Sequence, residues 1–423
     1  MSGTRSGSAV HWPTIVLLAL AMASGNVMLG VFSALQEGAK AELRLSDGQM
    51  GLLQGLAVSI PLALLAIPVG LAVDRGNRVR LLFVMSAVWT AGTLLTVVAR
   101  GMPLLFLARM LAGVGANLST TIAISIAADV SPPAQRGRSL LLLTIGKYAG
   151  TALAFALGGL LFGLFKQNGG LAQLPPWRSA HLVLGLASLI LTLGVLLIRE
   201  PERHEIAAGP HAPVRVVAAE LWERREFLIP LFVGQAGVLM ADASAAIWAA
   251  PVLSRSFRLE PENFAGWMGA VIFSSGVLGA ILGGLAADFG HRRARRGGIL
   301  LGAVIASILA LPAAAFPLAP SVPVFAGALF ALLLGGTITG LVTATAIAVL
   351  VPNELRGLCI GAFIAFGGLI AFGVSPSLVT ALSSVLGGEG QLAPALAIVG
   401  LGVSLCGAGG FWLAMRRTPD PIR

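Results

Sequence analysis

Charged residues are scarce in this sequence. Asp, Glu, Lys and Arg make up 11% of the 423 residues, whereas soluble proteins carry about 25%. Hydrophobic residues make up 57%, which is enough for roughly twelve membrane-spanning helices of about 20 apolar residues each. The scarcity of charge therefore excludes a soluble globule and a disordered chain.

Cysteine, histidine and aromatic residues are also few. The two cysteines, Cys359 and Cys406, lie in apolar stretches, which indicates small buried side chains and excludes a disulfide scaffold. The five histidines are scattered without metal-ligand spacing, so we expect no metal, no cofactor and no enzyme. Aromatic residues make up 6%, too few for an aromatic cage. The polar segment Met1–Trp12 and the lack of a clear cleavage site predict no cleavable signal peptide.

Apolar stretches follow one another in a six, linker, six order. This order predicts an all-α integral membrane protein of twelve transmembrane helices in two pseudo-symmetric bundles. We expect an N-terminal bundle over residues 1–198, a charged cytoplasmic linker over 199–226 and a C-terminal bundle over 227–423. The expected spans are 13–35, 50–73, 80–98, 103–128, 139–165, 180–198, 227–253, 264–287, 298–316, 322–350, 358–386 and 392–415.

The basic residues predict the orientation of the chain. With the N-terminus in the cytoplasm, 19 of the 28 Lys and Arg residues fall in inside segments and 7 in outside segments. This bias predicts that both termini are cytoplasmic and that the number of spans is even. The net charge of +10 does not indicate nucleic acid, because the bases lie in short loops. The dominance of arginine and alanine suggests a bacterial inner membrane.

Two segments recur at nearly one offset. Gly70–Arg78 matches Gly284–Arg292 at an offset of 214, and Pro132–Gly137 matches Pro352–Gly357 at an offset of 220. Two independent matches indicate parallel repeats of six helices related by an axis along the membrane normal.

These segments resemble signatures of the major facilitator superfamily. Gly70–Arg78 is similar to its loop signature between helices 2 and 3, and Leu105–Ala116 is similar to its second motif, including Arg109. The run Leu45–Gly55, together with Phe106–Met110, looks most like the spinster-like branch. That resemblance implies transport of lysophospholipid or sphingolipid-type substrates with proton coupling.

The sequence also departs from the spinster-like pattern. Members of that branch carry an acidic residue in the middle of helix 1, but Ser24–Met28 contains none. They also carry Glu after the Gly-x-Gly of helix 4, where this chain has Ala116 and Asn117. The two carboxylates that the resemblance would assign to proton transfer are therefore missing. The Gly-Pro pair of the antiporter motif on helix 5 is also altered, since Thr151 follows Gly150.

A set of charges is expected at the cytoplasmic ends of the helices. The resemblance implies that such residues form a cytoplasmic gate, and Asp74 would also face a helix N-terminus. The alternative is that they only set topology. In the second half, Val349 takes the position of Asp129, so the network there is weaker. The candidate gate residues are Asp74, Arg75, Arg78, Asp129, Asp288 and Arg292.

Two basic residues lie within the spans of the first half. Arg109 lies about six residues into span 4, where it faces a cavity or extends to the outer headgroups. Lys147 lies about eight residues into span 5 beside Tyr148, the single tyrosine. We hypothesise that Lys147 lines the central cavity and attracts an anion; the alternative is that it reaches the cytoplasmic surface along a groove.

Asp242 is the one carboxylate expected deep within a span. Burial disfavours its charged form, so it could take up a proton, or it could form an ion pair with Arg109 or Lys147. Asn26, Asn117 and Gln235 could bind substrate by hydrogen bonds or only bridge helices. No metal site is expected among these residues.

Several local features are also expected. Ser46 and Gln49 fit a capping box at the start of span 2. Small residues recur every four positions in span 5 and should let a neighbouring helix approach closely. Prolines should bend spans 2, 9 and 11. These small residues are Gly146, Gly150, Ala154 and Gly158, and these prolines are Pro61, Pro68, Pro312 and Pro376.

The sequence thus favours a secondary active transporter that works by alternating access. Two bases against one acid within the membrane favour an anionic or amphiphilic small molecule, such as a lysolipid or an organic acid. We expect a monomer in the inner membrane, with possible proton coupling and no nucleic-acid partner. The alternatives are a facilitated uniporter or exchanger without proton coupling, a receptor-like protein that does not transport, and an integral-membrane enzyme.

Overall fold

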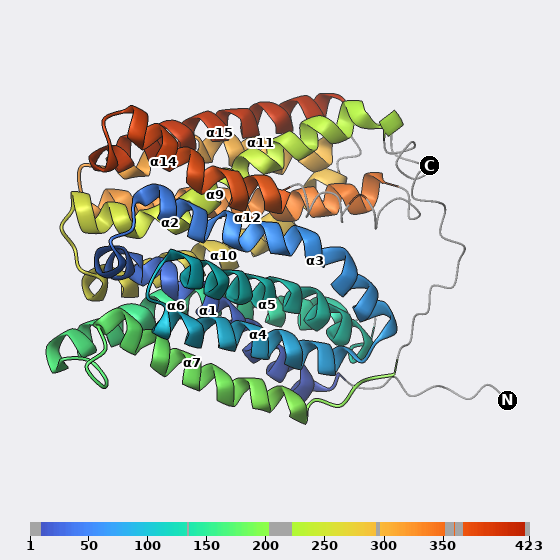
Figure 1. Ribbon diagram of the computed structural model, residues 1–423. Coiled ribbons are helices and arrows are strands. Elements are labelled where there is room, and N and C mark those ends of the chain that lie inside the picture. Colours follow the sequence, from blue (N-terminus) through green and yellow to red (C-terminus); the bar gives the residue numbers. More distant parts are fainter. Residues whose placement is uncertain are drawn as a thin grey trace. The chain divides into compact units, whose positions relative to one another are not determined.

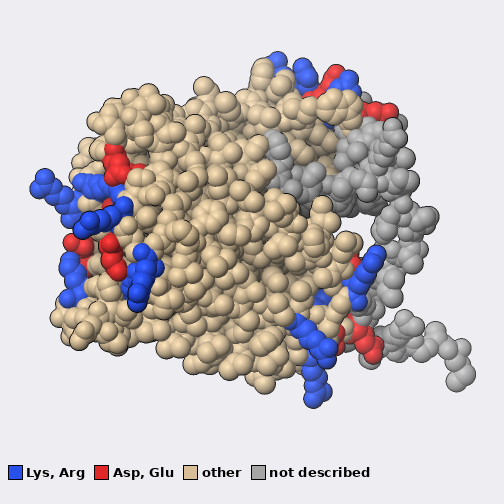
Figure 2. All heavy atoms as spheres, viewed as in Figure 1, with Lys and Arg blue, Asp and Glu red and all other residues tan. Residues whose placement is uncertain are grey.

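The computed structural model describes residues 10–132, 135–202, 222–292, 297–351, 359 and 367–418. Every regular element within these ranges is helical. Eleven helices among the described residues are long and apolar enough to cross a membrane (Figure 1). In the view of Figure 2, the charged side chains lie near helix ends and leave a broad uncharged surface along the helices.

The first six expected spans correspond to described helices, most of them longer than expected. Span 1 extends to Leu43 and span 5 to Asn168, so both helices continue past the apolar stretch. The elements are α1 (Trp12–Leu43), α2 (Asp47–Gln54) with α3 (Leu56–Arg75), α4 (Arg78–Val98), α5 (Met102–Asp129), α6 (Arg136–Asn168) and α7 (Pro176–Gly194) with η2 (Val195–Leu197).

The second half follows the same order. Its elements are α9 (Arg225–Ser256), α10 (Pro261–Arg292), η3 (Gly298–Leu300) with α11 (Leu301–Ala310) and η4 (Pro312–Leu318), α12 (Val322–Leu350), η5 (Leu369–Val374) with α14 (Ser375–Val385), and η6 (Glu389–Gln391) with α15 (Leu392–Arg416). Of the expected span 358–386, residues 358 and 360–366 lie outside the described residues, and Leu369–Val385 is a shorter apolar helix.

The second span is interrupted at Gly55. The capping box expected at Ser46 and Gln49 is confirmed, because both of its hydrogen bonds are present, at 2.9 and 3.2 Å. A Cβ at Gly55 would lie 2.8 Å from the carbonyl oxygen of Phe372, so only glycine permits this approach. The prolines Pro61 and Pro68 lie inside α3, which remains one helix. The interruption therefore comes from tertiary packing at a glycine.

Contacts divide the chain into two compact units. Unit 1 holds Met1–Arg44, Ile60–Ala208 and Pro261–Gly269, and unit 2 holds Leu45–Ser59, Gly209–Glu260 and Ala270–Arg423. Each unit thus includes a short segment from the other half of the chain. Within the expected linker, residues 203–221 lie outside the described residues.

Small residues bring α1 and α6 close together in unit 1. A Cβ at Gly146 would lie 2.6 Å from the carbonyl oxygen of Ala19, and one at Gly150 would overlap the backbone of Ala23. This confirms that the small-residue stripe serves close helix packing.

Glycines play the same part in unit 2, where α9 and α15 lie side by side (Figure 1). A Cβ at Gly234 would lie 2.9 Å from the backbone nitrogen of Phe411. Behind this contact, Phe411 and Leu231 belong to a cluster of buried apolar side chains. Close backbone packing against α15 therefore sets the orientation of α9 within unit 2.

Candidate functional site

Lys147 lies well inside a membrane-spanning helix and has an exposed side chain. It is about 17 Å along the α6 axis from Arg136. Its ammonium lies 6.0 Å from the centre of the Tyr148 ring, and no acidic group of the described residues pairs with it. A charged amine within hydrocarbon costs at least about 2.5 kcal/mol, so such groups usually face a hydrated space.

Two threonines flank Lys147 on α6. Thr144 and Thr151 lie one turn to either side of it, and their hydroxyls donate to carbonyls of the same helix, at 2.9 and 3.2 Å. The exposed side chains of Leu153 and Leu160 lie about 120° and 140° further around the helix. Leu140, two turns before Lys147, is also exposed and lies on the same side, so Lys147 shares a mixed face and lies away from the leucine face formed by Leu153 and Leu160.

Asn26 and Asn117 lie at one level of unit 1. Each is half-buried and donates a hydrogen bond of 2.8 Å to the carbonyl one turn earlier in its own helix. A Cβ at Gly25 would lie 3.4 Å from the Cα of Ala116, which places the two asparagines at equivalent heights on α1 and α5. Neither amide oxygen has a partner among the described residues, so both amides can accept a hydrogen bond.

Arg109 is enclosed within unit 1, with 3% of its surface exposed. Its guanidinium donates to the carbonyl oxygen of Leu29 at 3.2 Å and lies 4.7 Å from the centre of the Phe32 ring. These contacts join α5 to α1. Because the group is enclosed by protein, we interpret Arg109 as a brace between two helices rather than a group in contact with substrate.

Asp242 lies near the middle of α9 and packs against α12 in unit 2. It is half-buried, and its Oδ1 is enclosed without a hydrogen-bond partner among the described residues. A Cβ at Gly336 would fall on the Asp242 carboxylate, so the carboxylate occupies the space that this glycine leaves. Arg109 and Lys147 belong to unit 1, so an ion pair between either of them and Asp242 stays a hypothesis.

Gln235 lies two turns before Asp242 on the same face of α9. It is 1% exposed, and its Oε1 accepts a hydrogen bond of 3.0 Å from the hydroxyl of Thr343 on α12. This contact bridges two helices, α9 and α12, within unit 2.

Arg78 forms a network of charges at one end of unit 1. Its guanidinium pairs with Asp129 and with Glu200, the latter at 2.8 Å, and donates to the carbonyl oxygen of Pro201 at 3.1 Å. The same guanidinium reaches Ser125 on α5. The sequence placed Arg78 and Asp129 in one set of gate charges without pairing them, and it missed Glu200, which joins this network from the segment after η2.

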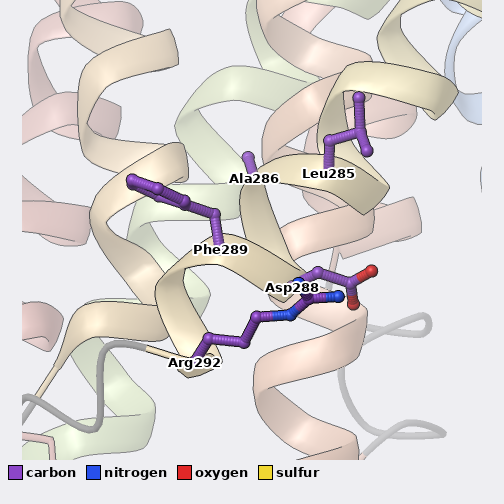
Figure 3. Close-up of a pocket in the computed structure, with 5 residues that line it drawn as sticks. All are labelled: Leu285, Ala286, Asp288, Phe289 and Arg292. Carbon is purple, nitrogen blue, oxygen red and sulfur yellow. The ribbon is translucent and has the colours of Figure 1, made fainter.

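The other charges expected at the gate lie on the surface. Asp74 and Arg75 at the end of α3 are both exposed. Asp288 and Arg292 are exposed one turn apart on α10 and line a pocket of about 490 Å³ with Leu285, Ala286 and Phe289 (Figure 3). Neither of the two has an ion-pair partner among the described residues. The charges at the ends of α3 and α10 are therefore exposed, whereas the network around Arg78 is buried.

Unit 1 also contains a buried basic residue that sequence analysis assigned to a loop. Arg178 lies inside α7, is 5% exposed, pairs with Glu42 at 3.0 Å and donates to the carbonyl oxygens of Val97 and Ala99. The Nε1 of Trp177 donates to the same carboxylate at 2.6 Å. The available signal was an acid, Glu42, in the segment after the expected span 1 and a base, Arg178, just before the expected span 6.

A second missed cluster lies in unit 2. The guanidinium of Arg255 donates to both carboxylate oxygens of Asp47, at 2.6 and 2.7 Å, and the backbone nitrogen of Asp47 donates to Glu389 at 2.7 Å. The cluster holds the start of α2 against α9 and η6. Its residues are far apart in the sequence, so spacing alone did not reveal it.

Comparison with known proteins identifies a family and related structures. Residues 15–376 match the model of the Major Facilitator Superfamily. An MFS-type efflux pump of Mycolicibacterium smegmatis is 27% identical over 98% of this chain and 94% of its own length. A glucose transport protein of Synechocystis is 28% identical over 52% of this chain and 48% of its own.

Solved structures share the fold. A bacterial homologue of the human lysosomal transporter Spinster, in an inward-facing and unoccupied conformation, superposes with a TM-score of 0.81 at 21% identity, covering all of both chains. A point mutant of the nucleoside transporter NupG superposes with a TM-score of 0.74 at 11% identity, covering 95% of this chain and 99% of its own.

Proposed function

The chain belongs to the Major Facilitator Superfamily and is a multi-pass membrane transporter, not an enzyme, and we propose that it moves an anionic or amphiphilic small molecule across the inner membrane. The two six-helix halves, residues 1–198 and 227–423, would move by alternating access around a central site. Both termini lie in the cytoplasm in this proposal, as the distribution of basic residues favours, and the protein acts as a monomer.

Lys147 carries this proposal. An exposed amine flanked by Thr144 and Thr151 on a membrane-spanning helix, with no acidic partner among the described residues, can attract an anionic group. Asn26 and Asn117 offer hydrogen-bond acceptors from neighbouring helices of the same unit. The acidic head group of an amphiphilic substrate would pair with the amine of Lys147, and its apolar tail would contact the apolar helices around it.

The charges at helix ends supply the gate in this proposal. Arg78 joins α4 to α5 and to the segment at Glu200, so a change in its partners would alter the position of these helix ends. The remaining gate residues are exposed, so their partners can change during the cycle without uncovering a buried charge; they are Asp74, Arg75, Asp288 and Arg292. We assign these groups to opening and closing on the cytoplasmic side.

Counterflow in proteoliposomes tests the substrate class. The probes are radiolabelled lysophosphatidylglycerol, an anionic lysolipid, and gluconate, a sugar acid. We expect counterflow of one probe by the wild type, a loss of about tenfold or more in Lys147→Ala and partial retention in Lys147→Arg, which keeps the charge. Lys166→Ala removes an amine at the far end of the same helix and serves as the matched control.

Unchanged counterflow in Lys147→Ala would overturn the assignment of Lys147. Equal transport of a cationic lysolipid analogue would overturn the proposed anionic class. An imposed pH gradient that leaves uptake unchanged would favour a uniporter or exchanger over a proton-coupled transporter.

A further inference from the structure

Asp242 is a half-buried carboxylate that the proposed substrate site leaves unused. It lies about 26 Å from the first residue of α9 and about 21 Å from the last, so neither helix end is within reach of its short side chain. An aspartate near the centre of a membrane-spanning helix is costly when charged unless it has a partner.

No opposite charge is available to Asp242 within the described part of unit 2. The helices that pack against α9 include α12, α14, η4 and η5, and none of them carries a charged side chain. On α15 the basic group is Arg416 at the last residue, about 20 Å from the level of Asp242, and the one other titratable group is the exposed Cys406. On α9 itself, Arg225, Glu226 and Arg255 lie near the helix ends.

The neighbouring hydroxyls are engaged elsewhere. Thr339 of α12 donates to the carbonyl oxygen of Gly336 at 2.9 Å. The hydroxyl of Ser375 donates to the carbonyl oxygen of Met240 at 2.8 Å and is in turn bonded to Ser244. With neither an ion partner nor a hydroxyl donor in the described part of unit 2, an ionised carboxylate at Asp242 would be poorly stabilised.

Glycine at position 336 creates the space for this carboxyl group. Any side chain there would overlap the carboxylate, whereas a Cβ at Gly340, one turn along the same helix, would lie an ordinary 3.8 Å from Gln235. The offset of 220 between the repeats relates Gly336 to Ala116, and Asp242 follows Asn26 by 216 residues. Asp242 thus lies on the helix that corresponds to α1, within a few positions of the counterpart of Asn26, and Gly336 lies on the helix that corresponds to α5.

From this geometry we infer that Asp242, seated against Gly336, is a proton-binding site of the transporter. The site lies in the second half of the chain and is separate from the amine at Lys147. The side chain is half-buried, so a proton can reach it, while its enclosed oxygen favours the neutral form. A role of Asp242 in coupling protons to transport rests on the proposed transport function, whereas proton binding at Asp242 does not depend on it.

Infrared difference spectroscopy on purified protein in lipid nanodiscs tests proton binding without any substrate. We expect the wild type to show the C=O band of a protonated carboxyl at neutral pH, and Asp242→Asn to lose it. Gly336→Ala should displace the group and move the loss of the band to lower pH by about one unit or more. Gly340→Ala adds the same methyl group without a clash and should leave the band unchanged.

Labelling with a hydrophobic carbodiimide gives a second measurement, because this reagent modifies protonated carboxyls in apolar surroundings. Mass spectrometry should find the adduct at Asp242 at neutral pH and its loss in alkaline buffer. A wild-type protein with neither band nor adduct at neutral pH would overturn the proton site, whatever the counterflow result. The same would follow if Gly340→Ala and Gly336→Ala behaved alike. A band and adduct at Asp242 in a protein that transports neither anionic probe would leave the site standing and remove the proposed substrate class.

Discussion

Arg255 holds Asp47 through two hydrogen bonds, at 2.6 and 2.7 Å, although 208 residues separate them. Such bidentate pairs are the strong form of ion pairing in proteins. The side chain of Asp47 is almost fully buried. The pair therefore attaches the start of the second span to the seventh, and any step that separates these two spans must break it.

Arg255→Ala should lower the stability of the protein. Removing the guanidinium leaves the buried carboxylate of Asp47 without its charged donor, at a cost of about 1.5–3 kcal/mol. The thermal unfolding midpoint of the purified protein in detergent measures this. Arg258→Gln removes a nearby exposed charge and should leave the midpoint almost unchanged. Equal midpoints for both variants would contradict the prediction.

Arg78→Ala should cost more than the neighbouring Arg80→Ala. The first removes the common partner of Asp129 and Glu200, and breaking a buried ion pair costs about 3–5 kcal/mol. The second removes an exposed side chain and should change stability by less than about 0.5 kcal/mol. Thermal unfolding of both variants compares them, and a similar loss in each would show that the network around Arg78 adds no stability.

Gly150→Ala should weaken the packing of α1 against α6. The new methyl group would overlap the backbone of Ala23, and overpacking of this kind costs about 1–3 kcal/mol. Gly266→Ala places the same group in open space on α10 and should be neutral or stabilising by up to about 1 kcal/mol. A thermal midpoint for Gly150→Ala at or above that of Gly266→Ala would refute the close-packing interpretation.

Lys147→Cys should make position 147 reactive toward a water-soluble maleimide. In a background with Cys359→Ser and Cys406→Ser, Lys147→Cys should be modified about tenfold faster than Leu160→Cys, because the thiolate forms only where water reaches the sulfur. Leu160 is also exposed but lies on the leucine face of the same helix. Equal rates at the two positions would place Lys147 in the lipid and remove its role in substrate binding.

Much of the fold follows from hydropathy and local chemistry. The apolar stretches predicted most helices to within several residues, and the capping box at Ser46 and the packing of Gly146 and Gly150 are confirmed. These features depend on residues close together in sequence or on the periodicity of one helix. The interruption at Gly55 was not predicted, because it depends on the approach of Phe372, which is distant in sequence.

The candidate site was harder to predict for the same reason. The hydropathy of the sequence placed Lys147 and Arg109 within spans, but it could not reveal that Arg109 is enclosed by Leu29 and Phe32. The seat of Asp242 against Gly336 also requires two helices that are distant in sequence. Residue type thus indicated which charged groups lie within membrane spans. The contacts of those groups depend on packing between helices, which the sequence alone did not show.

The composition of the two units has a consequence for splitting the chain. Unit 1 takes Pro261–Gly269 from the second half, and unit 2 takes Leu45–Ser59 from the first. Two separately expressed polypeptides divided between these halves would each lack a stretch that completes their own unit. Such fragments should accumulate only when produced together, which makes co-expression a direct genetic assay for reciprocal complementation.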